Sequence, residues 1–336
     1  MSNEGADKIL TIHDVARELG VSASTVSRAI SGKGRIGEAT RKRILEYIEE
    51  RGFYPNAAAQ SLAQSKTNTI AIVLPEVKEL VDMPFFHTCM YGVEEVAQVN
   101  EYDIIVVIAN GTDTKPLERL ILNRKVDGII LTRTYEDDCY ARYLKERQVP
   151  FVVVGRTRET DVIQVDHDNT GACRELVTVL FSKGIQQIAY LGGNMEQMVN
   201  ISRYEGYLDA FRKSGRKLDT DIVYTNLTSK VLVEKAVDEL LQRKVDCMLC
   251  QDDFICDEVV RKLARQQVDI PKEMRVASCH YSRVLENYPI TITSLKFNIM
   301  ELGRRTCQVL LDMINDKIVP DMTLLDYEII LKESTK

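Results

Sequence analysis

The sequence predicts an all-α N-terminal module followed by an α/β core built from two doubly wound parallel-sheet subdomains. Within the first 60 residues, apolar side chains recur at helical spacing between residues that begin and end helices. From Thr69 onward, short β-branched runs alternate with amphipathic stretches, which is typical of β-α-β units in parallel sheets. Roughly 270 residues of this pattern exceed the size of one such sheet, so two similar subdomains are expected.

The composition is that of a folded protein with an ample core. Among 336 residues, 45% are apolar and 28% are charged, which excludes an intrinsically disordered chain. No apolar run approaches the ~20 residues that span a membrane. The segment before Lys8 is polar, unlike a secretion signal. The eight cysteines are irregularly spaced, which favours reduced, buried thiols and a cytoplasmic protein.

The formal net charge of −6 is unevenly distributed along the chain. Residues 1–65 sum to +1 and residues 66–336 to −7, whereas the segment 28–43 alone carries +5. A basic patch on an acidic body favours a polyanionic partner at one end of the molecule. The alternative is a solvated helix face without a partner.

The first two helices are defined by their capping residues. Thr11 can cap a helix, Asp14 stands in the acidic position of a capping box, and Gly20 ends the helix. Ser22 caps a second helix, which ends at the flexible loop 31–34. Two short helices joined by such a turn form a helix-turn-helix, whose second helix can enter the major groove of DNA.

The second helix carries side chains suited to DNA recognition. Its N-terminal end offers free amides, and four hydroxyls can donate to phosphate oxygens: those of Ser22, Thr25, Ser27 and Ser31. Ala23 and Ser24 are small enough for a close approach to base edges, and Arg28 can bond a guanine bidentately. The alternative is an ordinary three-helix module, with a third helix over 38–51, whose serines only cap helices.

The segment after the third helix predicts a marginal helix and a linker. Pro55 disfavours helix at Tyr54, and Asn56 can cap a short helix over 57–63. That helix is almost wholly small and apolar, so it is expected to be unstable alone. The polar run 64–68 is typical of a linker. The expected domains are therefore a headpiece, 1–55, a hinge and linker, 56–68, and a core, 69–336.

These N-terminal segments resemble the lactose-repressor (LacI/GalR) family of bacterial transcription factors. The matching motifs are Thr11-Ile12-His13-Asp14-Val15-Ala16, Gly20-Val21-Ser22, Thr25-Val26-Ser27-Arg28, Thr40-Arg41, Gly52-Phe53-Tyr54-Pro55-Asn56 and Ala59-Gln60-Ser61-Leu62. The resemblance implies that Ala23, Ser24 and Arg28 read bases, and that Thr11, His13 and Thr40 contact the DNA backbone. It further implies a hinge helix in the minor groove, carrying Asn56, Ala59 and Leu62, with Leu62 wedging open the central base step. A two-fold dimer would then read a near-palindromic operator.

The core is expected to contain an N-subdomain (69–164 and 294–324) and a C-subdomain (165–293 and 325–336). Its predicted strands are Ile70–Leu74, Ile104–Ile108, Gly128–Thr132, Phe151–Val154, Ile188–Leu191, Ile222–Tyr224, Cys247–Cys250 and Val276–Cys279. Ligands of such folds bind at the carboxyl ends of the strands, so a ligand cleft is expected between the two facing subdomains.

The core resembles the effector-binding domain of the same family, which is akin to periplasmic sugar-binding proteins. The motifs are Pro84-Phe85-Phe86, Ser202-Arg203-Tyr204-Glu205-Gly206-Tyr207 and Asp252-Asp253-Phe254-Ile255-Cys256. The resemblance implies that Arg203 and Asp253 bond sugar hydroxyls, with Phe85 and His280 as further candidates for the cleft. The structural alternatives are a helix-start ion pair for Arg203 and a helix cap for Asp253. Leu227 replaces a frequent aromatic ring, and Ser278-Cys279-His280-Tyr281 replaces the usual Gly-Phe-Asp-Asp, so the identity of the sugar stays open.

Two groups of residues could suggest other chemistry. Cys247 and Cys250 have the spacing of metal ligands, but both fall inside a predicted buried strand rather than on a loop. His167 lies between Asp166 and Asp168, which is more typical of a turn into a capped helix than of acid–base catalysis. No phosphate loop, nucleophile elbow or dinucleotide fingerprint is present. Neither an enzyme nor a metal or other cofactor is expected.

The sequence therefore predicts a homodimeric repressor of carbohydrate-utilisation genes. Its affinity for double-stranded operator DNA would be controlled by a small-molecule effector, a sugar, bound in the cleft. Two alternatives stay open. The protein could be a catabolite-control-type regulator that responds to a phosphorylated carrier protein, or a cytoplasmic sugar-binding protein without a DNA function.

Overall fold

The computed structural model describes residues 10–32, 34–53, 66–76, 84–111 and 113–336. The chain forms two compact units that divide between Asn68 and Thr69. We call residues 10–32 and 34–53 of the first unit the headpiece, and the second unit the core. The expected hinge helix over 57–63, with Asn56, Ala59 and Leu62, lies outside the described residues.

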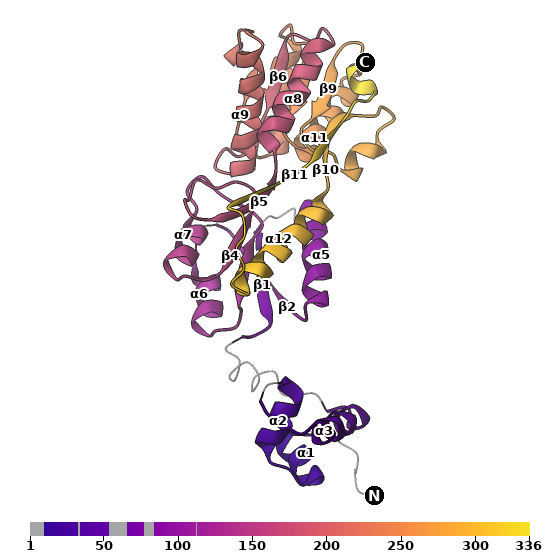
Figure 1. Ribbon diagram of the computed structural model, residues 1–336. Helices are drawn as coiled ribbons and strands as arrows, with labels where there is room; N and C mark the ends of the chain where they lie inside the picture. Colours follow the sequence, from indigo (N-terminus) through magenta and orange to yellow (C-terminus); the bar gives the residue numbers. More distant parts are fainter. Residues whose placement is uncertain (1–9, 33, 54–65, 77–83, 112) are drawn as a thin grey trace, which may run out of the picture. The chain divides into compact units, whose positions relative to one another are not determined.

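The headpiece is a three-helix module (Figure 1), with α1 at Ile12–Leu19, α2 at Ala23–Ser31 and α3 at Glu38–Arg51. Thr11 and Asp14 form the predicted capping box of α1, and Gly20 ends that helix in the left-handed conformation, with φ of 66°. The Ser22 hydroxyl caps α2 by accepting from the Thr25 amide at 3.1 Å. The three helices enclose a small apolar core of Val15, Ala16, Val26, Ala29, Ile44 and Phe53.

The first sheet of the core has six parallel strands in the order β11-β5-β4-β3-β1-β2. The strands are β1 (Thr69–Pro75), β2 (Asp103–Ala109), β3 (Gly128–Leu131), β4 (Phe151–Val154), β5 (Ile163–His167) and β11 (Met322–Leu325). One face is covered by α5 (Pro84–Val99) and α12 (Ile299–Ile314), the other by α6 (Lys115–Leu122) and α7 (Cys139–Glu146) (Figure 1). Each face therefore has its own apolar core.

The second sheet repeats this plan in the order β12-β10-β9-β8-β6-β7. Its strands are β6 (Ile188–Leu191), β7 (Val223–Tyr224), β8 (Cys247–Cys250), β9 (Arg275–Ser278), β10 (Thr293–Phe297) and β12 (Tyr327–Ile330). One face is covered by α8 (Asn169–Ser182) and α9 (Met198–Lys213), the other by α10 (Lys230–Leu241) and α11 (Asp253–Arg265). Short 3-10 helices span Thr220–Ile222, Arg283–Asn287 and Glu333–Thr335. The strand β12 pairs antiparallel with β10, an exception to the expected parallel order.

The predicted fold class is confirmed, and the eight predicted strands agree with observed ones to within one residue at each end. The chain crosses between the sheets three times, after His167, after Phe297 and at Asp326. Each crossing lies a few residues beyond the boundaries expected at 164, 293 and 324. The crossings come later than expected because β5, β10 and β11 each add a strand to the sheet of the segment before them, and the chain crosses only after that strand.

Glycines allow two helices of the core to cross at close range. A Cβ atom built on Gly92 in α5 would overlap the carbonyl oxygen of Met300, and one on Gly303 in α12 would overlap that of Cys89. Only glycine leaves room for these two backbones to touch. In the described part of the chain, no helix combines the length and the apolar character needed to span a membrane.

Candidate functional site

The predicted base-reading residues lie on the surface of α2. Ser24 and Arg28 are exposed and Ala23 is partly exposed, resting on the headpiece core. Val26 and Ala29, on the opposite side of the helix, are fully buried. The helix therefore presents one short polar face, which has the size and composition needed to approach base edges.

The candidate phosphate ligands of the headpiece also lie at the surface. Thr11, His13, Ser22, Ser27 and Ser31 are exposed, and Thr25 and Thr40 are partly exposed. The Ser22 hydroxyl is already bonded, at 2.8 Å to that of Ser24 and at 2.7 Å to that of Thr25. This hydroxyl network fixes the N-terminal turn of α2, where free amides suit a phosphate.

Two arginines of the basic segment fold against the glycine loop after α2. A Cβ atom on Gly34 would lie 3.3 Å from Cδ of Arg28, and one on Gly32 would lie 3.0 Å from a terminal guanidinium nitrogen of Arg41. Both glycines have positive φ. The loop thus holds two cationic side chains beside the exposed face of α2, while Arg43 ties α3 to the Leu19 carbonyl at 2.7 Å.

A second candidate site is a cleft of about 110 Å³ at the carboxyl ends of both sheets. All three predicted effector residues, Phe85, Arg203 and Asp253, line it. The cleft is bounded by residues from both subdomains: Pro84, Phe85, Phe86, Thr132, Arg133, Thr134, Val154, Gly155, Asp166, His167, Asn169, Gln197, Val199, Asn200, Arg203, Asp252, Asp253, His280, Phe297, Ile299 and Leu302. The cleft therefore has the position expected for an effector site.

Arg203 is held in a fixed orientation at the floor of the cleft. Its side chain is only 8% exposed. Nε donates to Oδ1 of Asn169 at 3.0 Å, and a terminal nitrogen donates to the Gln251 carbonyl at 2.9 Å. Its guanidinium lies 5.9 Å from the centre of the Phe297 ring. The alternative role as an ion-pair partner is wrong for the described part of the chain, where no carboxylate lies within 4 Å of it.

Asp253 pairs with a histidine rather than capping its helix. Nδ1 of His280 lies 3.1 Å from Oδ1 of Asp253. Burial would raise the pKa of Asp253, but the hydrogen bond and the charge of His280 outweigh it and hold this pKa at about 2. The cap of α11 is Asp252, which accepts from the Ile255 amide at 2.8 Å. The alternative assignment of Asp253 as the cap is therefore wrong.

Two neighbouring groups of the cleft have pKa values shifted in opposite directions. Burial raises the pKa of Asp166 to about 7, against the lowering effect of bonds from the His167 amide and Asn169. Burial, with the charges of His280 and Arg203, lowers the pKa of His167 to about 4. Nε2 of His167 is buried and has no hydrogen-bond partner among the described residues. A ligand hydroxyl in the cleft would supply that partner.

Asp166→Asn is expected to stabilise the protein at alkaline pH. In the folded chain this carboxyl keeps its proton up to about pH 7, whereas an ordinary aspartate loses it near 3.8. Between pH 3.8 and about pH 7 the folded state binds more protons than the unfolded state, so the free energy of unfolding of the parent falls as pH rises. We expect the variant to gain roughly 2–4 kcal/mol over the parent at pH 8 and little at pH 4.

Urea denaturation at pH 4, 6 and 8 measures this difference. The opposite shift of His167 is present in both proteins and cancels in the comparison. Asp103→Asn, at an exposed position that forms no ion pair among the described residues, is the matched control for removal of an aspartate carboxylate. A gain for Asp166→Asn that does not change with pH would contradict the raised pKa.

The remaining residues discussed in the sequence analysis lie in a strand, a helix cap or an apolar core. His167 ends β5, and the helix after it is capped by Asp168, which accepts from the Gly171 amide at 2.9 Å. Leu227 is buried in the apolar core of the second sheet and does not line the cleft. Cys247 and Cys250 are buried on opposite faces of β8, in separate cores. No cluster of metal-ligating residues occurs in the described ranges.

The sequence-based interpretation missed several cleft residues. Arg133 lies two residues after β3, Asn169 lies two residues after β5, and Phe297 ends β10. Each lies at or just after the carboxyl end of a strand. A search for polar and aromatic residues at the strand ends would have found Arg133, because β3 was predicted with the correct start.

A backbone clasp joins the two subdomains at the edge of the cleft. The Glu136 amide donates to the Glu196 carbonyl at 2.8 Å, and the Met198 amide donates to the Thr134 carbonyl at 3.1 Å. Between these bonds, Tyr135 and Gln197 form an antiparallel bridge. We call the two loops 133–136 and 196–198 the clasp.

Comparisons with known proteins match both units. Residues 11–56 match the family described as bacterial regulatory proteins, lacI family. Residues 67–325 match periplasmic binding proteins and sugar binding domain of LacI family.

Full-length relatives are similar to the chain over nearly its whole length. The HTH-type transcriptional regulator MalR of Streptococcus pneumoniae is 30% identical over 91% of this chain and 93% of its own. Catabolite control protein A of Priestia megaterium is 29% identical over 97% of this chain and 99% of its own. The solved structure of the transcriptional regulator CelR in complex with cellobiose is 28% identical and superposes with a TM-score of 0.72, covering 97% and 99% of the two chains.

Proposed function

The chain belongs to the lacI family of bacterial regulatory proteins, and from this we propose that it represses carbohydrate-utilisation genes in response to a sugar. It would act in the cytoplasm as a homodimer on near-palindromic operator DNA. The proposed function involves no catalytic step. The supporting observation is that one chain contains both kinds of site. The helix α2 exposes Arg28, and residues of both subdomains line a polar cleft in the core.

The proposed function assigns the DNA contacts to particular residues. Ala23, Ser24 and Arg28 would read base edges. The phosphate ligands would be Thr11, His13, Ser22, Thr25, Ser27, Ser31 and Thr40. Asn56, Ala59 and Leu62 would enter the minor groove from the hinge, where an apolar wedge kinks the duplex.

The cleft offers groups that suit a polyol. Arg203 has guanidinium hydrogens beyond its two bonds, Asp253 offers carboxylate oxygens, and His167 offers an unpaired ring nitrogen. The Phe85 ring supplies an apolar surface. A sugar that binds only one arrangement of the subdomains shifts the equilibrium toward it, and by linkage changes the affinity for the operator.

The test begins with selection of bound sequences from genomic DNA by the purified protein. Fluorescence anisotropy then measures operator affinity with and without a panel of mono- and disaccharides. We expect one sugar to change this affinity at least about 5-fold, the lower range of allosteric coupling. A sugar that binds without changing operator affinity would contradict its role as effector. Failure to enrich any sequence would contradict a DNA-binding function.

Arg203→Lys is expected to abolish the response to that sugar. A lysine retains the charge, but its single nitrogen cannot occupy the positions of the two different nitrogens by which Arg203 bonds Asn169 and Gln251. The measurement is the sugar-induced change in melting temperature. Arg212→Lys, at an exposed position of the same helix, should keep the full response. An unchanged response of Arg203→Lys would remove Arg203 from the effector site.

A second candidate function follows from the similarity to catabolite control protein A. In that case a phosphorylated carrier protein, rather than a sugar alone, would raise the affinity for DNA. Pull-down with the carrier in its phosphorylated and unphosphorylated forms separates the two candidates. Capture of only the phosphorylated form would favour the second.

A further inference from the structure

Two guanidinium groups face the cleft from opposite subdomains. Arg133 follows β3 in the first sheet, and Arg203 lies on α9 of the second. Among the described residues, neither forms an ion pair with a carboxylate, although 23 other pairs within 4 Å occur there. Arg203 is instead held by two neutral carbonyl oxygens, those of Asn169 and Gln251.

Arg133 is also held by neutral groups. Its guanidinium lies 4.9 Å from the centre of the Phe86 ring. Burial lowers the pKa of Arg133, against the raising effect of the nearby Tyr135 and of Asp252. Arg133 is partly buried and Arg203 is buried, and a cation withdrawn from water without a counter-ion is costly. This cost falls when an anion binds beside it.

The carboxylates of the cleft are already bonded to local donors. Asp253 is paired with His280 at 3.1 Å. Asp166 accepts from the His167 amide at 2.8 Å and from Asn169 at 3.1 Å. Asp252 accepts from the Ile255 amide as the cap of α11. None of these three carboxylates therefore forms an ion pair with either guanidinium group, although all three line the same cleft.

We propose that the effector is a sugar carrying an anionic group, a phosphate or a carboxylate, and that Arg133 and Arg203 hold this group from the two sides of the cleft. The inference rests on the proposed function, because it specifies the chemistry of the same effector. Guanidinium groups bind both anions bidentately through strong, charge-assisted hydrogen bonds. The hydroxyls of the sugar would meet Asp253, His280 and His167.

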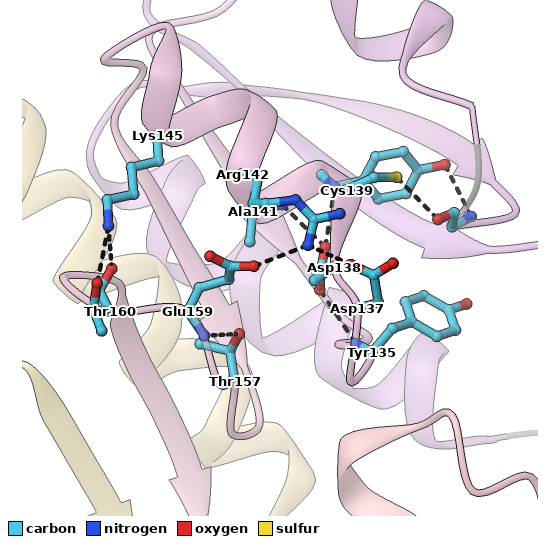
Figure 2. Close-up of polar contacts among 12 residues, drawn as sticks. Tyr135, Asp137, Asp138, Cys139, Ala141, Arg142, Lys145, Thr157, Glu159 and Thr160 are labelled. Atoms are coloured by element: carbon cyan, nitrogen blue, oxygen red, sulfur yellow. Dashed lines mark hydrogen bonds and ion pairs between the residues drawn. The ribbon is translucent and has the colours of Figure 1, made fainter.

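The position of Arg133 couples this anion to closure of the cleft. Arg133 begins the loop 133–136, whose Thr134 and Glu136 make the clasp bonds to the second subdomain. The same loop is braced from the side by Asp138, which accepts from the amides of Tyr135, Tyr140 and Ala141 (Figure 2). An anion bound to both arginines therefore links a rigid loop of one subdomain to α9 of the other.

The test compares charged and neutral forms of the same sugar. Probes are glucose, cellobiose and maltose, their 6-phosphates, glucuronate as the carboxylate, and inorganic phosphate. Thermal shift and isothermal titration calorimetry measure binding to the full chain and to Arg133→Gln and Arg133→Lys. We expect a phosphate or carboxylate form to bind best, to weaken about 10- to 100-fold in Arg133→Gln, and to recover partly in Arg133→Lys.

Arg119→Gln is the matched control, since it removes a charge from an exposed position on α6 of the same subdomain. It should bind every probe as the parent does. If neutral sugars bind equally well to the parent and to Arg133→Gln, the claim that the effector carries an anionic group is wrong, whereas the proposal of a sugar effector is retained. If inorganic phosphate binds as tightly as any sugar phosphate, the sugar contributes nothing to binding, and the claim that the effector is a sugar is wrong. Absence of any binding would overturn both proposals, while operator selection still reports DNA binding.

Discussion

Replacing Arg28 by alanine is expected to weaken binding to the cognate operator by about 1–3 kcal/mol and to relax the sequence preference at one base pair. Arg28 lies on the exposed face of α2, and its stem rests against Gly34. A guanidinium can bond a guanine bidentately, so its removal costs a base contact on the cognate site. Competition anisotropy on operators with single base-pair changes measures both effects.

Two comparisons separate base reading from general attraction to phosphate. Random DNA should lose much less affinity than the operator when Arg28 is replaced, because a base contact is lost only on the cognate site. Arg51→Ala removes an equal charge from the last turn of α3 and is the matched control. It should affect operator and random DNA alike. Equal weakening of both DNAs by Arg28→Ala would refute base reading by this residue.

Gly303→Ala is expected to destabilise the core by about 3 kcal/mol, the upper range for overpacking. The added Cβ would overlap the carbonyl oxygen of Cys89, so α12 and α5 must separate along their crossing. The gain in helix propensity from glycine to alanine, about 1 kcal/mol, offsets only part of this cost. For a unit of this size we expect the melting temperature to fall by roughly 6–12 °C.

Glu301→Ala is the control for this prediction. It places the same residue, alanine, two positions earlier in α12 by truncating a side chain that is 47% exposed, and should change the melting temperature little. The crossing also positions the cleft, since α5 begins with Phe85 and Phe86 and α12 carries Ile299 and Leu302 at its rim. Gly303→Ala should therefore weaken effector binding as well. A variant as stable as the parent would show that the two helices adjust without separating.

The local elements could be predicted because their signals are local. Thr11, Asp14 and Ser22 cap helices through bonds to residues three positions away. The central strands are continuous apolar runs. By contrast, β5 contains Gln164, Asp166 and His167, and β10 contains Lys296, so neither shows the apolar run of a buried strand. Their pairing is determined by distant partners, β11 and β12, which no local pattern reveals.

The candidate site could be predicted only in part. Arg203, Asp253 and Phe85 were identified through resemblance, and all three line the cleft. The pairing of Asp253 with His280 joins residues 27 positions apart, and the bonds of Arg203 to Asn169 and Gln251 span longer separations still. Arg133 was missed although it follows a predicted strand; its position marks the carboxyl end of the sheet, but its sequence neighbours do not show which cleft residues of the second subdomain lie near it.

The threefold crossing between the sheets has a consequence for synthesis of the chain. The first sheet lacks its edge strand β11, and one face of β3, β4 and β5 stays bare, until residues after 298 have been made. The headpiece needs only the earliest segment, and the second sheet is complete except for β12 when the ribosome reaches α12. The first subdomain, although it begins near residue 69, is therefore finished among the last, and its apolar face is exposed to aggregation throughout translation.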